Sequence, residues 1–144
     1  MAKEQLVGTW KLVSFELRHS DGQVTYPMGK DPLGVLMYDE SGRMSAQLME
    51  RDRPPFAVAD HHKGAPEEIK AAFEGYTAYF GTYELDEEKG TVTHHVEGAL
   101  LPNLVGRRQV RFYEFTGDQL MLSTPPMPWG GEQRTGFLVW KRGS

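Results

Sequence analysis

Most of the chain consists of short runs in which hydrophobic and polar residues alternate. In the first run, residues 9–18, the side chains fall into two sets: Trp10, Leu12, Ser14 and Glu16 on one face, and Val13, Phe15 and Leu17 on the other. Such alternation is typical of a β-strand with one buried face. Equivalent runs predict further strands at residues 23–26, 35–38, 43–49, 82–85, 91–97, 109–115, 119–124 and 136–141. Most of the 16 glycines and 9 prolines fall between these runs, where turns are expected.

Residues 66–79 follow a different period. Apolar side chains recur there at helical spacing: Ile69, Ala72, Phe73, Tyr76, and either Tyr79 or Phe80. Pro66 suits the first turn of a helix, and the two glutamates that follow it favour the positive end. We therefore predict one helix over residues 66–79. Residues 51–65 lose periodicity and are predicted to form a loop, and the prolines of residues 125–128 are expected to exclude regular structure.

Eight or nine short strands with one helix favour a closed sheet. Closure removes the exposed strand edges that promote aggregation, and a barrel of eight strands is wide enough for side chains or one small ligand. Polar residues interrupt both faces of several strands, which suits a lumen of mixed character. We predict an all-β fold, a single antiparallel up-and-down barrel forming one domain over residues 1–144, with the helix capping one barrel end.

Charge and composition exclude several classes of partner. The chain carries 16 basic and 20 acidic residues, for a net charge of −4, and has no basic stripe for nucleic acid. No apolar run approaches the ~20 residues of a membrane helix. Residues 1–5 lack the apolar stretch of a signal peptide and the chain has no cysteine, so we expect a cytoplasmic protein. Nucleotide-binding and hydrolase motifs are missing, and no cofactor is expected.

His94 and His95 are candidates for acid–base chemistry, because imidazole titrates near neutral pH. As neighbours in a strand they face opposite sides of the sheet, so only one can point into the barrel. His94 points inward if Val92 and Val96 do, and His95 points inward if they do not. A single histidine in a lumen more often bonds a neighbour or contacts a ligand than catalyses, so we prefer that role.

Arg111 and Tyr113 share one face of their predicted strand and could bind a ligand carboxylate or phenolate. An exposed strand edge with ordinary surface pairs would explain the same pattern equally well. Glu16 is the candidate counter-charge, because an unpaired carboxylate inside a barrel would be costly. Histidine, aromatic and methionine side chains complete the predicted ligand contacts: Trp10, Tyr38, Met44, Tyr79, Tyr83, His95 and Trp129. Trp129 is expected at the rim or in a lid.

Asp60, His61 and His62 are adjacent in the predicted loop. Zinc requires three or four converging ligands, and the sequence offers neither a cysteine nor a His-x₃-His pair. We therefore expect a solvated loop here and no metal site.

Several segments resemble the lipocalin-like domain family of small bacterial and fungal barrels. Residues 6–10 are similar to the Gly-x-Trp signature that begins the first strand of lipocalins and fatty-acid-binding proteins. Further similar segments follow in order at residues 8–16, 32–38, 42–45, 79–83, 94–98, 102–103, 118–120 and 140–142. The resemblance implies a calycin-type barrel with an interior ligand site. It also implies that Arg142 stacks on Trp10 and closes the barrel bottom, a contact stabilising by about 0.5–2 kcal/mol.

Taken together, these features predict a barrel that binds one apolar or aromatic molecule bearing a polar or acidic group, as a monomer or homodimer. The alternative is a cofactor-free isomerase or cyclase on a natural-product-like substrate in the same cavity, with His94 or His95 as acid–base and Arg111 or Tyr113 stabilising charge. The sequence leaves open whether the protein is an enzyme. A module that binds another protein by a barrel edge or by its helix is a third possibility.

Overall fold

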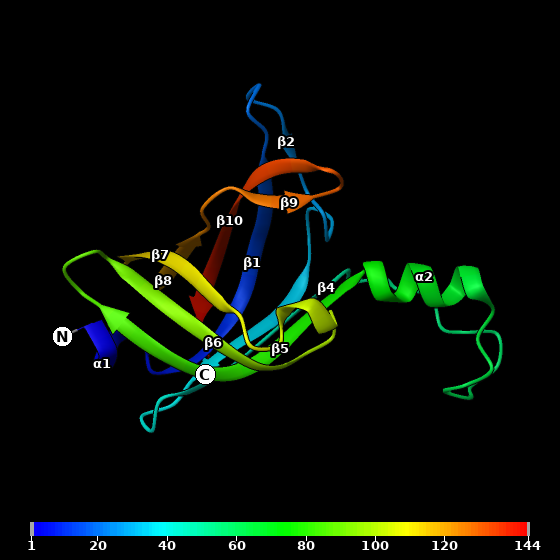
Figure 1. Cartoon of the computed structure of the whole chain (residues 1–144), viewed down its shortest axis with the longest axis horizontal. Coiled ribbons are helices and arrows are strands. Elements are labelled where there is room, and N and C mark those ends of the chain that lie inside the picture. The colour runs from blue at the N-terminus through cyan, green and yellow to red at the C-terminus, as the bar shows by residue number, and fades with distance from the viewer. Residues whose placement is uncertain (1, 144) are drawn as a thin grey trace.

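The computed structural model describes residues 2–143. Eight antiparallel strands close into a barrel, because the first and last of them, β1 (Gly8–Arg18) and β10 (Glu132–Arg142), pair with each other. Between them, in order, lie β3 (Leu33–Tyr38), β4 (Arg43–Met49), β5 (Tyr76–Asp86), β6 (Thr91–Ala99), β7 (Arg108–Thr116) and β8 (Gln119–Ser123). Two short strands, β2 (Val24–Thr25) and β9 (Met127–Trp129), extend the sheet beyond β1 and β10 (Figure 1). The predicted all-β barrel is confirmed.

A β-bulge in β1 decides which of its side chains face the core. The pairing with β10 slips between Leu12 and Ser14, so Val13 is an extra residue on this strand. The alternation therefore changes phase: Leu12 is buried before the bulge, and Phe15 is buried after it. The unbroken alternation predicted for residues 9–18, which placed Glu16 on the same face as Trp10, is wrong for this reason.

One end of the barrel is closed by Trp10 and Arg142, as the resemblance implied. The guanidinium carbon of Arg142 lies 4.0 Å from the Trp10 ring centre, and its Nη1 donates to the Val7 carbonyl at 2.7 Å. Trp10 Nε1 donates to the carbonyl of Leu6, the last residue of helix α1 (Ala2–Leu6), at 2.8 Å. Gly8 has a φ of +136°, and a Cβ there would lie 2.6 Å from Arg142 Nη1. The glycine of the Gly-x-Trp signature thus leaves space for the arginine.

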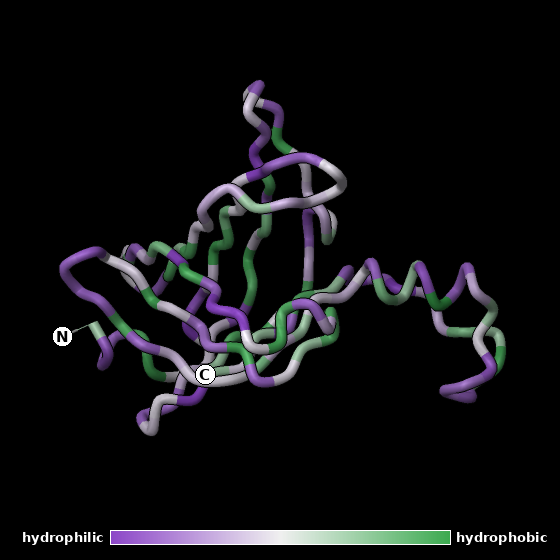
Figure 2. The backbone as a smooth tube through the Cα atoms, viewed as in Figure 1, coloured by the Kyte–Doolittle hydropathy of each residue, from purple (hydrophilic) through white to green (hydrophobic). Residues whose placement is uncertain are grey.

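The predicted helix is shorter than expected, and it does not lie over an end of the barrel. Helix α2 (Pro66–Glu74) ends at Gly75, and the aromatic run that follows belongs to β5, because aromatic residues favour a strand once the helix has ended. None of the residues of α2 is buried. Figure 1 shows α2 projecting away from the barrel, and Figure 2 shows hydrophilic residues along much of it. The expectation that this helix caps a barrel end is wrong.

The proline-rich stretch before the last strand does contain a strand. β9 pairs with β10, with Pro128 opposite Gln133. A proline is tolerated there because β9 is the outermost strand of the sheet and its outer side needs no N–H donor. The remaining regular element is the 3₁₀-helix η1 (Pro102–Leu104), which lies between β6 and β7. No helix within residues 2–143 combines the length and apolar character that crossing a membrane requires.

Candidate functional site

The orientation of β6 decides which of the two histidines, His94 or His95, points into the barrel. Val92 and Val96 are buried in the barrel core, so His94 between them also points inward and is only 1% exposed. His95 points to the outer face, where its Nε2 lies 2.6 Å from Glu84 Oε1 and its side chain is 33% exposed. His94 is therefore the histidine of the barrel interior, and His95 does not belong among the predicted ligand contacts.

His94 bridges two tyrosine hydroxyl groups in the core. Its Nε2 lies 2.6 Å from the hydroxyl oxygen of Tyr38 on β3, and its Nδ1 lies 2.6 Å from that of Tyr79 on β5. All three side chains are buried. Three strands thus contribute one continuous hydrogen-bonded chain, Tyr38–His94–Tyr79, inside a largely hydrophobic core.

Burial sets the protonation of this chain. The pKa of His94 is lowered from 6.5 to about 3. Desolvation is the largest cause, and the positive charge of Arg111 and the neighbouring His95 act in the same direction. Burial also raises the pKa of Tyr38 and of Tyr79, while Arg111 acts in the opposite direction on both. At neutral pH the imidazole is therefore uncharged and both hydroxyl groups keep their hydrogens.

Arg111 lies on the inward-facing side of β7, opposite Val92, which is two residues from His94 on the same face of β6. Its guanidinium donates to the Val110 carbonyl at 3.0 Å and to Gln109 Oε1 at 3.3 Å. Within residues 2–143 no carboxylate forms an ion pair with it. Tyr113, two residues further along the same face, is half-buried and packs against the core.

The predicted counter-charge is not in the lumen. Glu16 lies on the outer side of β1 beyond the bulge, where its Oε1 is 2.9 Å from Nη2 of Arg18. Arg18 in turn stacks on the ring of Phe137 at 3.7 Å. The interpretation of Glu16 as a partner for Arg111 inside the barrel is therefore wrong, and the cause is the change of phase in β1.

The other predicted contacts lie in three places: the core, the closed end and the opposite end of the barrel. Met44 and Tyr83 are buried in the core, and Tyr83 packs edge-on against Tyr38 with ring centres 4.9 Å apart. Trp10 is buried at the closed end described above. Trp129 lies in β9 and packs edge-on against Phe15 at 5.9 Å, near the end of the barrel opposite Trp10. It is a half-buried strand residue here, held against the core.

Trp140 lies in the core near the closed end of the barrel, opposite Leu12 of β1 and Leu120 of β8. Its side chain is buried on the inner side of β10, and its Nε1 has no hydrogen-bond acceptor among the described residues. A buried donor without an acceptor is unfavourable by about 1–3 kcal/mol.

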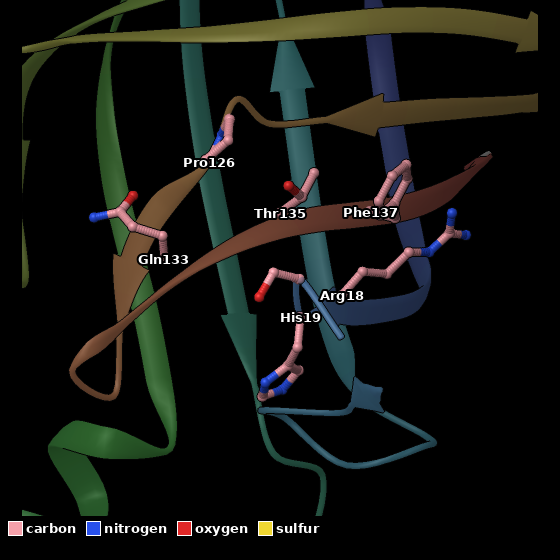
Figure 3. A pocket seen from close by; sticks show the side chains of 7 residues that line it. Arg18, His19, Pro126, Gln133, Thr135 and Phe137 are labelled. Carbon is pink, nitrogen blue, oxygen red and sulfur yellow. The ribbon is translucent and has the colours of Figure 1, made fainter. Parts of the chain in front are cut away.

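A separate open hollow of about 390 Å³ lies on the outer surface (Figure 3). Its lining includes Gln133, Thr135 and Phe137, which alternate along β10 with the inward-facing residues. Arg18 at the end of β1 and His19 directly after it complete this side of the hollow. The hollow is therefore distinct from the interior around His94.

The loop histidines do not converge on further ligands. The rings of His61 and His62 pack against each other with centres 5.2 Å apart, and the His62 backbone N–H donates to Asp60 Oδ1 at 3.0 Å. No group of three or more histidine or acidic side chains within residues 2–143 has a geometry that could hold a metal ion.

Comparison with known proteins agrees with this architecture. The sequence profile of the lipocalin-like domain family matches residues 7–143, which include all eight barrel strands and every residue of the His94 site. A comparison with curated proteins gives no significant match.

Proposed function

We propose, given that the chain belongs to the lipocalin-like domain family, that its barrel binds one small apolar or aromatic molecule bearing a polar or acidic group. The observation that carries this proposal is the hydrogen-bonded Tyr38–His94–Tyr79 chain beside Arg111 in an otherwise hydrophobic core. Polar groups inside a hydrophobic site fix the orientation of a ligand, while the apolar lining contributes most of the affinity.

Incomplete burial along one side of the barrel supports the same proposal. Tyr113 on β7 and Leu138 on β10 face the core but are only half-buried, whereas the inward residues of β3 and β4, such as Leu36 and Leu48, are almost fully buried. Apolar side chains that point inward and still contact solvent are suited to packing against a ligand.

Native mass spectrometry of freshly purified protein tests the proposal by revealing a bound molecule. Saturable fluorescence enhancement of Nile red, a neutral apolar probe, gives a second measurement. We expect Leu138→Trp, which enlarges an inward side chain, to weaken Nile red binding about tenfold or more. Val139→Trp is the matched control, because the adjacent residue faces outward on the same strand. Equal Nile red affinity for the two variants, or no binding at all, would contradict the proposal.

Isomerisation or cyclisation without a cofactor is the second candidate function. It is favoured by one observation, the position of His94 between two hydroxyl groups, since such a chain can relay a proton. The lowered pKa of His94 makes it a weak base, so one of the flanking hydroxyl groups would serve as the acid. Conversion of the co-purified molecule to an isomer of identical mass by the wild-type protein, lost in His94→Gln, would support catalysis.

A further inference from the structure

The hydrogens of the Tyr38–His94–Tyr79 chain can be counted. Each hydroxyl group carries one hydrogen and the neutral imidazole carries one on nitrogen, about three in all. Two of them lie within the chain, in the two bonds of 2.6 Å. An imidazole donates from one nitrogen and accepts at the other, so one tyrosine donates to His94 and the other accepts from it. The accepting tyrosine keeps its own hydrogen for an acceptor outside the chain.

Tyr79 is the tyrosine whose hydrogen is free for such an acceptor. It is 8% exposed, whereas Tyr38 at the other end of the chain is 2% exposed. Arg111 lies on β7 opposite Val92, two residues from His94 on the same inward face of β6, so its guanidinium is close to the chain. Burial raises the pKa of Tyr79, and the charge of Arg111 lowers it. The chain then runs in one direction: Tyr38 donates to His94 Nε2, His94 Nδ1 donates to Tyr79, and Tyr79 donates outward beside the guanidinium.

Donors exceed acceptors around the Tyr38–His94–Tyr79 chain. Arg111 donates to the Val110 carbonyl and to Gln109 Oε1, and among residues 2–143 no carboxylate pairs with it. The buried polar side chains of the same residues are three threonines and His94, and none of them is acidic. A site that offers a guanidinium and unused N–H and O–H donors is complementary to an oxygen anion.

We propose that the polar group of the ligand is a carboxylate, bound by the Arg111 guanidinium and by the Tyr79 hydroxyl at the end of this one-way chain. This inference rests on the proposed binding function and names the chemical class of its ligand. An ammonium group at the same position would be repelled by Arg111 and would leave the Tyr79 hydrogen without an acceptor. A neutral amide would accept that hydrogen but would lack the charge.

Two matched series of compounds test the assignment by displacement of Nile red. The first is decanoate, decanamide and decylamine, and the second is 1-naphthylacetate with its amide and the corresponding amine. We expect each carboxylate to bind about 10- to 100-fold more tightly than its amide, because hydrogen bonds to charged groups are the stronger kind, and each amine to bind most weakly.

Arg111→Gln should remove the preference by weakening carboxylate binding to about the level of the amide. Circular dichroism and cooperative thermal unfolding of the variant show that it is folded. Arg108→Gln is the matched control, since Arg108 lies on the same strand, is exposed and pairs in register with the outward-facing His95. This variant should keep the full preference for carboxylate.

The direction of the hydrogen bonds along Tyr38, His94 and Tyr79 can be measured by NMR spectroscopy. In the decanoate complex, the ¹⁵N shifts of the His94 imidazole should show the hydrogen on Nδ1. Amides or amines that bind as tightly as carboxylates, or an Nε2–H imidazole in the complex, would overturn this inference while leaving the binding function intact. Failure of Nile red and all six compounds to bind would overturn the proposed function as well.

Discussion

Lowering the pH from about 7 to about 5 protonates the histidines of an unfolded chain, whereas His94 in the folded barrel stays neutral because its pKa is lowered from 6.5 to about 3. The unfolded state then binds one more proton than the folded state, so the free energy of unfolding falls as the pH falls. The contribution is absent well above pH 6.5, grows below it and levels off near pH 3. Between pH 7 and pH 5 these pKa values give a loss of about 2 kcal/mol.

Urea denaturation at several pH values, followed by tryptophan fluorescence, measures this loss. His94→Gln removes the titrating group while keeping a donor and an acceptor for the two tyrosine hydroxyl groups. The variant should lose about 2 kcal/mol less stability than the wild type between pH 7 and pH 5, since the carboxylates titrate equally in both. His62→Gln, in the exposed loop, should behave like the wild type. Parallel pH dependence in wild type and His94→Gln would refute the reasoning.

Three further substitutions test the closed end and the projecting helix, each by thermal and urea unfolding. Trp10→Ala should reduce the free energy of unfolding by about 3–5 kcal/mol, because it removes a fully buried indole and the Arg142 stack; an unchanged melting temperature would contradict this. Gly8→Ala should reduce the free energy of unfolding by about 1–3 kcal/mol, because the φ of +136° is strained for alanine and the new methyl group meets the Arg142 guanidinium. An unchanged free energy of unfolding would show that the backbone and Arg142 can move apart at this end of the barrel. Ile69→Lys, on helix α2 and 52% exposed, should change stability by less than about 0.5 kcal/mol, and a larger loss would mean that α2 packs on the barrel.

The sequence was sufficient to predict the barrel, because strand alternation and turn residues are local signals. It was insufficient where a local pattern has two readings. Tyr76 and Tyr79 continue the helical spacing of Ile69 and Phe73, but aromatic residues are equally typical of strands. Only the end of α2 at Gly75 shows that both belong to β5, where they lie on opposite faces. The bulge at Val13 leaves no mark in the residue types, so every side chain after it in the strand was assigned to the wrong face.

The candidate site could be predicted only in part, because its geometry depends on contacts between different strands. Both histidines were candidates, and the side chains around them could not settle the choice until Val92 and Val96 were placed inside. Tyr38 and Tyr79 were proposed as ligand contacts, yet their link through His94 depends on bringing β3, β5 and β6 together around the lumen. Contacts of this kind connect residues distant in sequence, and no periodicity along one strand encodes them.

The pairing of β1 with β10 also has a consequence for how the chain reaches this structure. Arg142 binds the carbonyl of Val7, 135 positions away, so the barrel cannot close until nearly all of this sequence has been synthesised. Until then one edge of β1 is free to pair with other chains, and such distant pairing slows folding. Gly143 N nevertheless lies 2.7 Å from Thr9 O. A circular permutant in which a linker joins the two ends of the chain and the exposed loop at residues 51–65 is opened would place β10 directly before β1. The pairing that closes the barrel would then be a local one.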